Sequence, residues 1–140
     1  MGNKYDGKHI KVSCAIIERA GLVLAARRSQ AMAMPLKWEF PGGKLKRGEK
    51  PDACLKRELM EEMGINVIII TSLSPSTHHY PDFTVTLYPF VCAIDAEEII
   101  LNDHQAIVWL RPAELTSLDW AEADFPVIEA YQRSLGSDIP

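Results

Sequence analysis

The pattern of hydrophobic and polar positions along the chain predicts strands more often than helices. Segments rich in β-branched and other apolar residues, which are typical of strands, occur at 9–17, 22–26, 65–71, 83–94 and 105–110. Pro89 lies inside one of these segments and predicts an edge strand or a bulge, because proline has no N–H to donate to a strand ladder.

Two segments predict helices. Residues 51–63 begin with Pro51, which suits the first helical position, and are followed by Gly64, which suits the position just past a helix end. Residues 126–135 are amphipathic, and 112–115 predicts one helical turn. The stretches 27–36 and 38–48 predict loop and turn, the second because it is rich in glycine. The combination predicts an α/β (α+β) fold, a mixed β-sheet with helices on its faces.

Composition narrows the class of protein. The 140 residues predict one domain spanning 1–140, with 47% hydrophobic and 24% charged residues. A net charge of −4 provides no basic surface for a nucleic acid polymer. No apolar run reaches membrane-spanning length and the first residues are polar, so we expect a cytoplasmic protein with no membrane partner. Cysteines Cys14, Cys54 and Cys92 show neither a disulfide framework nor zinc spacing.

Three glutamates gather on one side of the first predicted helix. At about 100° per residue, Glu58, Glu61 and Glu62 fall within roughly a third of the helix circumference. Glu58 and Glu62 are one turn apart, where like charges repel. Mg²⁺ would relieve this repulsion, because it prefers oxygen ligands and often bridges carboxylates to substrate phosphates. The alternative is a solvated acidic face, but the fixed spacing from Gly43 to Ile65 favours function.

These residues resemble the Nudix box, here at 43–65. The pattern is glycine, five residues, glutamate, seven residues, arginine and glutamate, an aliphatic residue, any residue, two glutamates, any residue, glycine and an aliphatic residue. The chain matches it at Gly43, Glu49, Arg57, Glu58, Leu59, Glu61, Glu62, Gly64 and Ile65. The resemblance implies a Nudix-type mixed sheet sandwiched between helices. It also implies a Mg²⁺ or Mn²⁺ site and hydrolysis of a nucleoside diphosphate linked to another moiety.

The resemblance also implies roles for individual residues. Glu58, Glu61 and Glu62 would hold the metal, and Glu58 is also a candidate general base. Gly42 would offer its backbone carbonyl, and Arg57 would orient the glutamates. Outer ligands would come from Glu49 and from Asp103, for which a plain loop aspartate is the alternative.

The likeness continues outside the box, toward the MutT-like branch of the family. It is carried by the segments 27–28, 38–44, 80–82 and 123–128, whereas 103–109 is more similar to the CTP pyrophosphohydrolase branch. Substrate binding is therefore expected at Arg28, Met32-Ala33-Met34, Glu39, Phe40, Pro41, Gly42, Phe83 and Asp124. For the residues at 32, 34 and 83 the alternative is loop and core packing. His79 and His104 are expected at the polar surface or behind the site.

The expected function is Mg²⁺-dependent hydrolysis of a nucleoside triphosphate to a monophosphate and pyrophosphate, with oxidised nucleotides such as 8-oxo-dGTP as substrates. A CTP or dCTP pyrophosphatase is the alternative, because MutT-like enzymes carry asparagine where this chain has Asp124. An ionised carboxylate only accepts hydrogen bonds, so Asp124 either suits a base edge rich in donors, such as the amino group of cytosine, or is protonated. Asp124 could equally be the N-cap of the last helix. An idle nucleotide-binding module is a third possibility, which the intact box glutamates argue against. The partner is a small nucleotide, and the protein is expected to be a monomer or homodimer.

Overall fold

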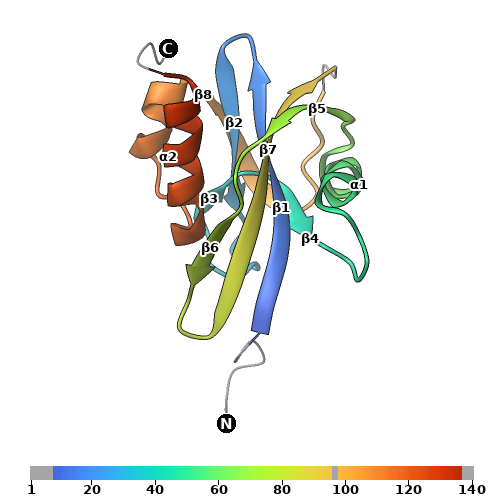
Figure 1. Ribbon diagram of the computed structural model, residues 1–140. Coiled ribbons are helices and arrows are strands. Elements are labelled where there is room, and N and C mark those ends of the chain that lie inside the picture. Colours follow the sequence, from blue (N-terminus) through green and yellow to red (C-terminus); the bar gives the residue numbers. More distant parts are fainter. Residues whose placement is uncertain (1–7, 96–97, 137–140) are drawn as a thin grey trace.

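A computed structural model describes residues 8–95 and 98–136. Its strands form one mixed sheet with the order β3-β2-β1-β7-β5, in which β4 also pairs with β1, β6 with β7, and β8 with β2 (Figure 1). The strands are β1 Lys8–Arg19, β2 Leu22–Arg28, β3 Trp38–Glu39, β4 Gly42–Lys44, β5 Val67–Ser72, β6 Ser76–His79, β7 Phe83–Ile94 and β8 His104–Leu110. The helices are α1 Pro51–Met63 and α2 Phe125–Ser134, with short 3-10 helices at Pro112–Ser117 and Glu122–Asp124.

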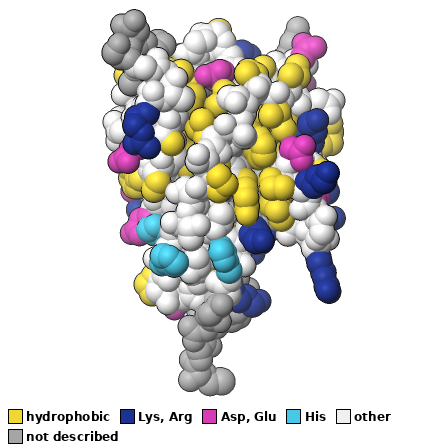
Figure 2. Space-filling model, viewed as in Figure 1, with side chains coloured by type: hydrophobic (Ala, Val, Ile, Leu, Met, Phe, Trp, Pro, Cys, Tyr) yellow, Lys and Arg dark blue, Asp and Glu magenta, His cyan; other side chains and the backbone are white. Residues whose placement is uncertain are grey.

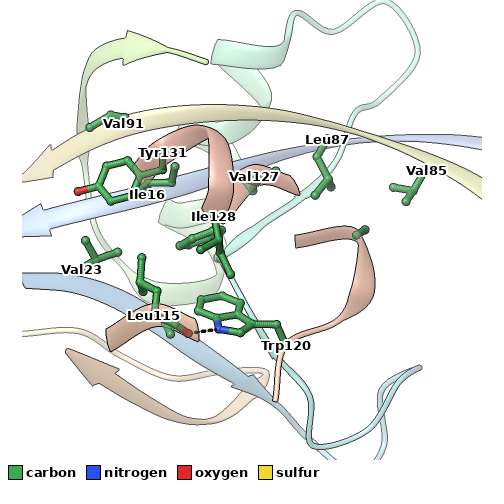
Figure 3. Packing of buried hydrophobic residues seen from close by; sticks show 14 residues of the cluster. Ile16, Val23, Val85, Leu87, Val91, Leu115, Trp120, Val127, Ile128 and Tyr131 are labelled. Carbon is green, nitrogen blue, oxygen red and sulfur yellow. Dashed lines mark hydrogen bonds between the residues drawn. The ribbon is translucent and has the colours of Figure 1, made fainter. Parts of the chain in front are cut away.

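The two helices cover opposite faces of the sheet (Figure 1). On the α1 face, the predicted stripe of Leu55, Leu59 and Met63 is fully buried against residues of β1 and β2. The other face is covered by α2 and the segment that precedes it, which pack Trp120, Ile128 and Tyr131 onto the sheet (Figure 3). No helix within 8–95 and 98–136 is long and apolar enough to cross a membrane. The predicted mixed sheet between helices is therefore confirmed.

Pro89 does not lie in an edge strand, and this part of the prediction is wrong. β7 pairs in parallel with β1 on one side and with β5 and β6 on the other. Pro89 lies where the neighbouring chain leaves β5 and before it enters β6, and its carbonyl accepts the Leu73 N–H at 2.9 Å. The irregularity is in β5 instead, where the register shifts between Ile69 and Thr71. Pro89 is tolerated because no neighbouring strand needs its missing N–H there.

The stretch 38–48 is more ordered than the predicted loop. It contains β3 and β4, two short strands that pair with β2 and β1. A side chain on Gly42 would overlap the backbone of Ser13, so this glycine permits the close approach of β4 to β1. Residues 76–79 also form a strand, β6, where the sequence pattern predicted no element. Tertiary pairing creates these strands, because they are too short for any sequence pattern to specify.

The ends of α1 follow the prediction. Pro51 is at the first helical position, and Gly64 adopts the left-handed conformation with φ 65° while its N–H donates to the Met60 carbonyl at 3.1 Å. Lys50 occupies the N-cap position and forms no capping hydrogen bond with its side chain. The helix that carries the acidic side chains is therefore bounded by local signals that the sequence contains.

Candidate active site

The helix α1 presents its acidic side chains next to the glycine pair that precedes it. A side chain on Gly43 would overlap the Glu58 side chain, so glycine is required for Glu58 to lie against β4. The Cys54 thiol, which is buried, contacts the Gly43 carbonyl at 3.5 Å. The close approach of β4 to α1 therefore sets the position of Glu58.

Arg57 joins three of the glutamates. Its guanidinium binds both carboxylate oxygens of Glu49, with distances of 2.8 Å and 2.9 Å. Its Nη1 also donates to Glu58 at 3.0 Å and to Glu61 at 3.2 Å. These contacts lower the pKa of Glu49 to about 2, chiefly through the hydrogen bonds from Arg57. Arg57 therefore bonds to three of the glutamates of this region, Glu49, Glu58 and Glu61.

Glu62 differs from the other glutamates of the helix because it has no positive partner within the described residues. Its Oε2 atom is buried and no hydrogen-bond partner for it lies within 8–95 or 98–136. Burial raises the pKa of Glu62 to about 8, with further contributions from the negative charges of Glu58, Asp103 and Glu39. These four residues, Glu39, Glu58, Glu62 and Asp103, are called the carboxylate cluster below.

Glu61 lies further from this cluster. Its side chain is 57% exposed and turned toward Arg57. Over residues 8–95 and 98–136, no three His, Cys, Asp or Glu side chains stand close enough together to hold a metal ion without rearrangement. In the arrangement observed, Arg57 thus holds the carboxylates of Glu58 and Glu61, while the buried Oε2 of Glu62 has no hydrogen-bond partner among the described residues.

Glu39 connects the carboxylate cluster to a second group of polar residues. Its Oε1 receives a hydrogen bond from Arg28 Nη1 at 2.6 Å, and its Oε2 lies 2.7 Å from His104 Nε2. Arg28 also donates from Nε to the Ala33 carbonyl at 2.6 Å. The Ala33 side chain itself is exposed, so position 33 contributes its backbone. Of the two positions expected for His104, the polar surface and the region behind the site, the structure shows the second, because its side chain is only 3% exposed and bonds to Glu39.

Asp124 is buried, with 5% of its surface exposed, and its carboxylate does not cap α2. Its Oδ1 instead accepts the Phe40 N–H at 3.4 Å. The segment before it runs beside β3, since the backbone of Trp38 bonds to Asp119 and Ala121 at 2.9 Å each. Burial raises the pKa of Asp124 well above its usual value, and the nearby charge of Glu39 adds to this. Asp124 therefore occupies the N-cap position of α2, as the sequence suggested, but its side chain forms no capping hydrogen bond.

The other residues that were predicted to bind substrate lie near the polar residues around Arg28, Glu39 and Asp124. Phe83 stacks on Tyr80 at 4.9 Å, and the Tyr80 hydroxyl accepts the Ala123 N–H at 3.1 Å, next to Asp124. Phe40 packs its ring on Trp120 at 4.8 Å. Pro41 is buried, with its carbonyl bonded to the Ala15 N–H at 2.8 Å. In the loop, Met32 and Met34 are half-buried, and the Met32 sulfur lies 3.4 Å from the Ser29 nitrogen.

The acidic side chains on and around α1 offer the oxygen ligands that a divalent cation prefers. Such a cation can promote hydrolysis of a phosphate ester or anhydride. A family model described as the NUDIX domain matches residues 7–131, and the chain belongs to the Nudix hydrolases. Enzymes of this family generally use a divalent metal ion and act on small nucleotide substrates.

Known relatives cover most of the chain. It is 35% identical over 136 residues to the CTP pyrophosphohydrolase of Escherichia coli, a match that spans 89% of this chain and 92% of that protein. It is 39% identical over 87 residues to the 8-oxo-dGTP diphosphatase of Proteus vulgaris, which spans 61% of this chain and 78% of that protein. The solution structure of the E. coli ORF135 protein superimposes with a TM-score of 0.80 at 30% identity and covers 94% of both chains. The fold and the family agree with the resemblance that the sequence shows.

Proposed function

We propose that this chain is a Mg²⁺-dependent nucleoside triphosphate pyrophosphohydrolase that acts on free nucleotides, including oxidised ones. In this reaction water adds to a phosphorus within the triphosphate chain and pyrophosphate leaves, so the products are a nucleoside monophosphate and pyrophosphate. The observation that carries the proposal is the buried Oε2 of Glu62 in the carboxylate cluster, which has no hydrogen-bond partner in the part of the chain that the structure describes. The relatives named for this type of reaction support it.

The residues present fit a hard divalent cation. A buried carboxylate oxygen without a donor, next to further carboxylates, is costly unless a cation binds it. Glu58 and Glu62 would hold the ion, with Glu61, Asp103 and the Gly42 carbonyl as further oxygen ligands. When bound, Mg²⁺ makes a water more acidic and offsets charge on the phosphates. Glu58 and Glu61 would turn away from Arg57, which keeps its two bonds to Glu49.

The residues beyond Glu39 would hold the nucleoside. Arg28, the loop around Ala33 and the Phe40 backbone lie together with Asp124, and Tyr80 and Phe83 border them. Glu58 would take a proton from the attacking water, as the general base of the reaction. Because Glu39 touches Arg28 and also acts electrostatically on Glu62 and Asp124, it stands between the two halves of the site.

The choice of base is proposed to depend on Asp124. An ionised Asp124 would favour cytosine, and this keeps a CTP or dCTP pyrophosphatase as the second candidate function. Burial favours the protonated form, which can donate one hydrogen bond and accept others. A protonated Asp124 can therefore also bind the mixed donor and acceptor edge of an oxidised guanine, as asparagine can.

A substrate panel tests the proposal. Pyrophosphate release with Mg²⁺ is measured for 8-oxo-dGTP, dGTP, CTP, dCTP and a methylated dCTP, and kcat/KM is compared across them. We expect release from at least one of these substrates and its loss in Glu62→Gln. Glu129→Gln, which changes an exposed glutamate of α2, is the matched control and should match the unmodified protein. Nucleotide binding without pyrophosphate release from any of the five would instead identify an idle binding module.

A further inference from the structure

His104 differs from the three other histidines of the chain in its surroundings. His9 lies on β1, and His78 and His79 lie on β6, where histidines gather on the lower part of the surface in Figure 2. His104 begins β8, and its side chain is only 3% exposed. A buried histidine needs hydrogen-bond partners, because an unpaired ring nitrogen in the interior costs free energy. Its ring is hydrogen-bonded to the side chain of Glu39.

A β-bulge turns His104 toward the α1 face. Along β8, Ile107 and Trp109 face α1, whereas Val108 and Leu110 face α2. Simple alternation would therefore place Gln105 on the α1 face and His104 on the other. The register with β2 shifts, however, from Arg27 opposite Ala106 to Arg28 opposite His104. The extra residue brings His104 onto the face that carries Arg28 and Glu39.

The hydrogen bonds from His104 form a chain that ends at the loop after β2. Glu39 is a carboxylate and accepts, so the His104 Nε2–H donates to its Oε2 at 2.7 Å. The other oxygen of Glu39 binds Arg28 at 2.6 Å. Arg28 in turn holds the Ala33 carbonyl at 2.6 Å. Through these three hydrogen bonds, His104 is connected to the loop that follows β2.

Without its two hydrogen bonds, the Glu39 side chain would be repelled by neighbouring carboxylates. Its charge acts unfavourably on both Glu62 and Asp124, which lie on its two sides. With both oxygens bound, to Arg28 and to His104, the carboxylate is fixed between them. Removal of the histidine would leave one oxygen without its buried donor, and the side chain could then turn.

We propose that His104 is a positioning residue for the nucleotide. It acts through Glu39 and holds Arg28 and the loop 29–36 in the arrangement that receives the substrate. The inference rests on the proposed location of the nucleoside beside Arg28. Since the histidine acts on binding and not on the reacting phosphate, its loss affects the ground state and the transition state alike.

The kinetic test compares three variants with 8-oxo-dGTP and dCTP as substrates. His104→Ala should raise KM about tenfold and change kcat by less than about threefold. His104→Gln should restore KM to within about threefold of the unmodified protein, because its amide N–H can also donate to Glu39. His9→Ala removes a histidine that also bonds through Nε2, to Thr86 at 2.6 Å, and should leave both constants unchanged. A fall in kcat with KM unchanged, or no recovery with glutamine, would overturn the proposal.

A double-variant cycle tests whether the effect passes through Glu39. In a Glu39→Gln background, His104→Ala should change KM by less than about twofold, because the coupled partner is already altered. If the change in KM of the double variant equals the product of the two single changes, His104 acts independently of Glu39, and the proposal is overturned.

Amide hydrogen exchange tests the positioning role of His104 independently of whether the protein catalyses the proposed reaction. In nucleotide-free protein, peptides covering 29–37 should exchange at least about fivefold faster in His104→Ala than in His104→Gln or His9→Ala. The Leu36 N–H, which donates to the Arg28 carbonyl at 3.0 Å, reports on this loop directly. Unchanged exchange would contradict the positioning role. Faster exchange in a protein that hydrolyses none of the panel would support the positioning role while the proposed reaction fails.

Discussion

The pKa values of two carboxylates, the partly buried Glu62 on α1 and the buried Asp124 at the start of α2, are both raised by their surroundings. Burial is the largest cause of the raised pKa for both residues. Their neighbours differ, however. Glu62 is near three other carboxylates, and its Oε2 has no partner among the described residues. Asp124 accepts a backbone N–H from Phe40, and Arg28 nearby favours its charged form.

The comparison indicates that the neighbouring groups, more than the depth of burial, determine which kind of ligand each carboxylate suits. A carboxylate among carboxylates favours a cation, because only added positive charge removes the repulsion. A carboxylate beside an N–H group and an arginine suits an uncharged polar ligand such as a nucleobase. The experiments below test this contrast, from the largest expected effect to the smallest.

Removal of divalent metal should abolish activity. Excess chelator is expected to reduce pyrophosphate release to background, and added Mg²⁺ or Mn²⁺ should restore it, because the carboxylate cluster needs a cation to bind phosphate. The measurement is turnover of the best substrate of the panel in metal-free buffer. Turnover that continues at full rate with the chelator would refute the proposed role of Glu62 and its neighbours.

Charge removal at the cluster should impair the reaction more than charge removal at Asp124. Glu58→Gln and Glu62→Gln are each expected to lower kcat by roughly 100-fold or more, if the residue is a ligand or base. Glu61→Gln should have a smaller effect, because its side chain is exposed and turned toward Arg57. Asp124→Asn should keep kcat for its best substrate within about tenfold. Circular dichroism is the control that each variant is folded. An equal fall in kcat for the cluster variants and for Asp124→Asn would contradict the proposed difference between the two sites.

Substitution of Asp124 should change which base is preferred. Loss of a base contact leaves a polar group of the nucleotide unpaired and should alter discrimination by about 1–3 kcal/mol. Asp124→Asn is expected to shift the order of kcat/KM toward 8-oxo-dGTP, and Asp124→Ala should flatten it. The same panel of five nucleotides measures both variants. An unchanged order in both would place base selection elsewhere, at Arg28, Met32, Met34 or Phe83.

The smallest effect concerns stability in the absence of metal. The pKa of Glu62 is raised from 4.5 to about 8, so the folded protein binds a proton that the unfolded chain has already released. The free energy of unfolding should therefore fall as the pH rises from about 4.5 to about 8. Glu62→Gln should reduce this slope in urea unfolding curves. Added Mg²⁺ should also reduce it for the unmodified protein, whereas Asp124→Asn should retain the response of unmodified protein to Mg²⁺. A slope that is equally steep in Glu62→Gln would assign the pH dependence to other groups.

Local patterns in the sequence predicted the position, the ends and the buried side of α1 well. The apolar stripe of Leu55, Leu59 and Met63 predicted which side of the helix is buried, and Pro51 and Gly64 predicted its ends. These features depend on helix periodicity and on backbone preferences within a few residues, which any sequence displays directly. The long strands β1 and β7 were predicted for the same reason.

Features that depend on contacts between distant segments could be found only in the tertiary structure. Alternation along β8 points His104 away from the site, and only pairing with β2 reveals the bulge that turns it toward Glu39. Asp124 has the sequence context of an N-cap, yet its carboxylate bonds to Phe40, 84 positions away. β3 and β4 exist because β1 and β2 offer them backbone partners. Sequence therefore determined the fold class and the acidic helix, because these follow from local periodicity. Tertiary packing decided which carboxylate oxygen is buried without a partner among the described residues, because the neighbours of a buried group come from segments far apart in the chain.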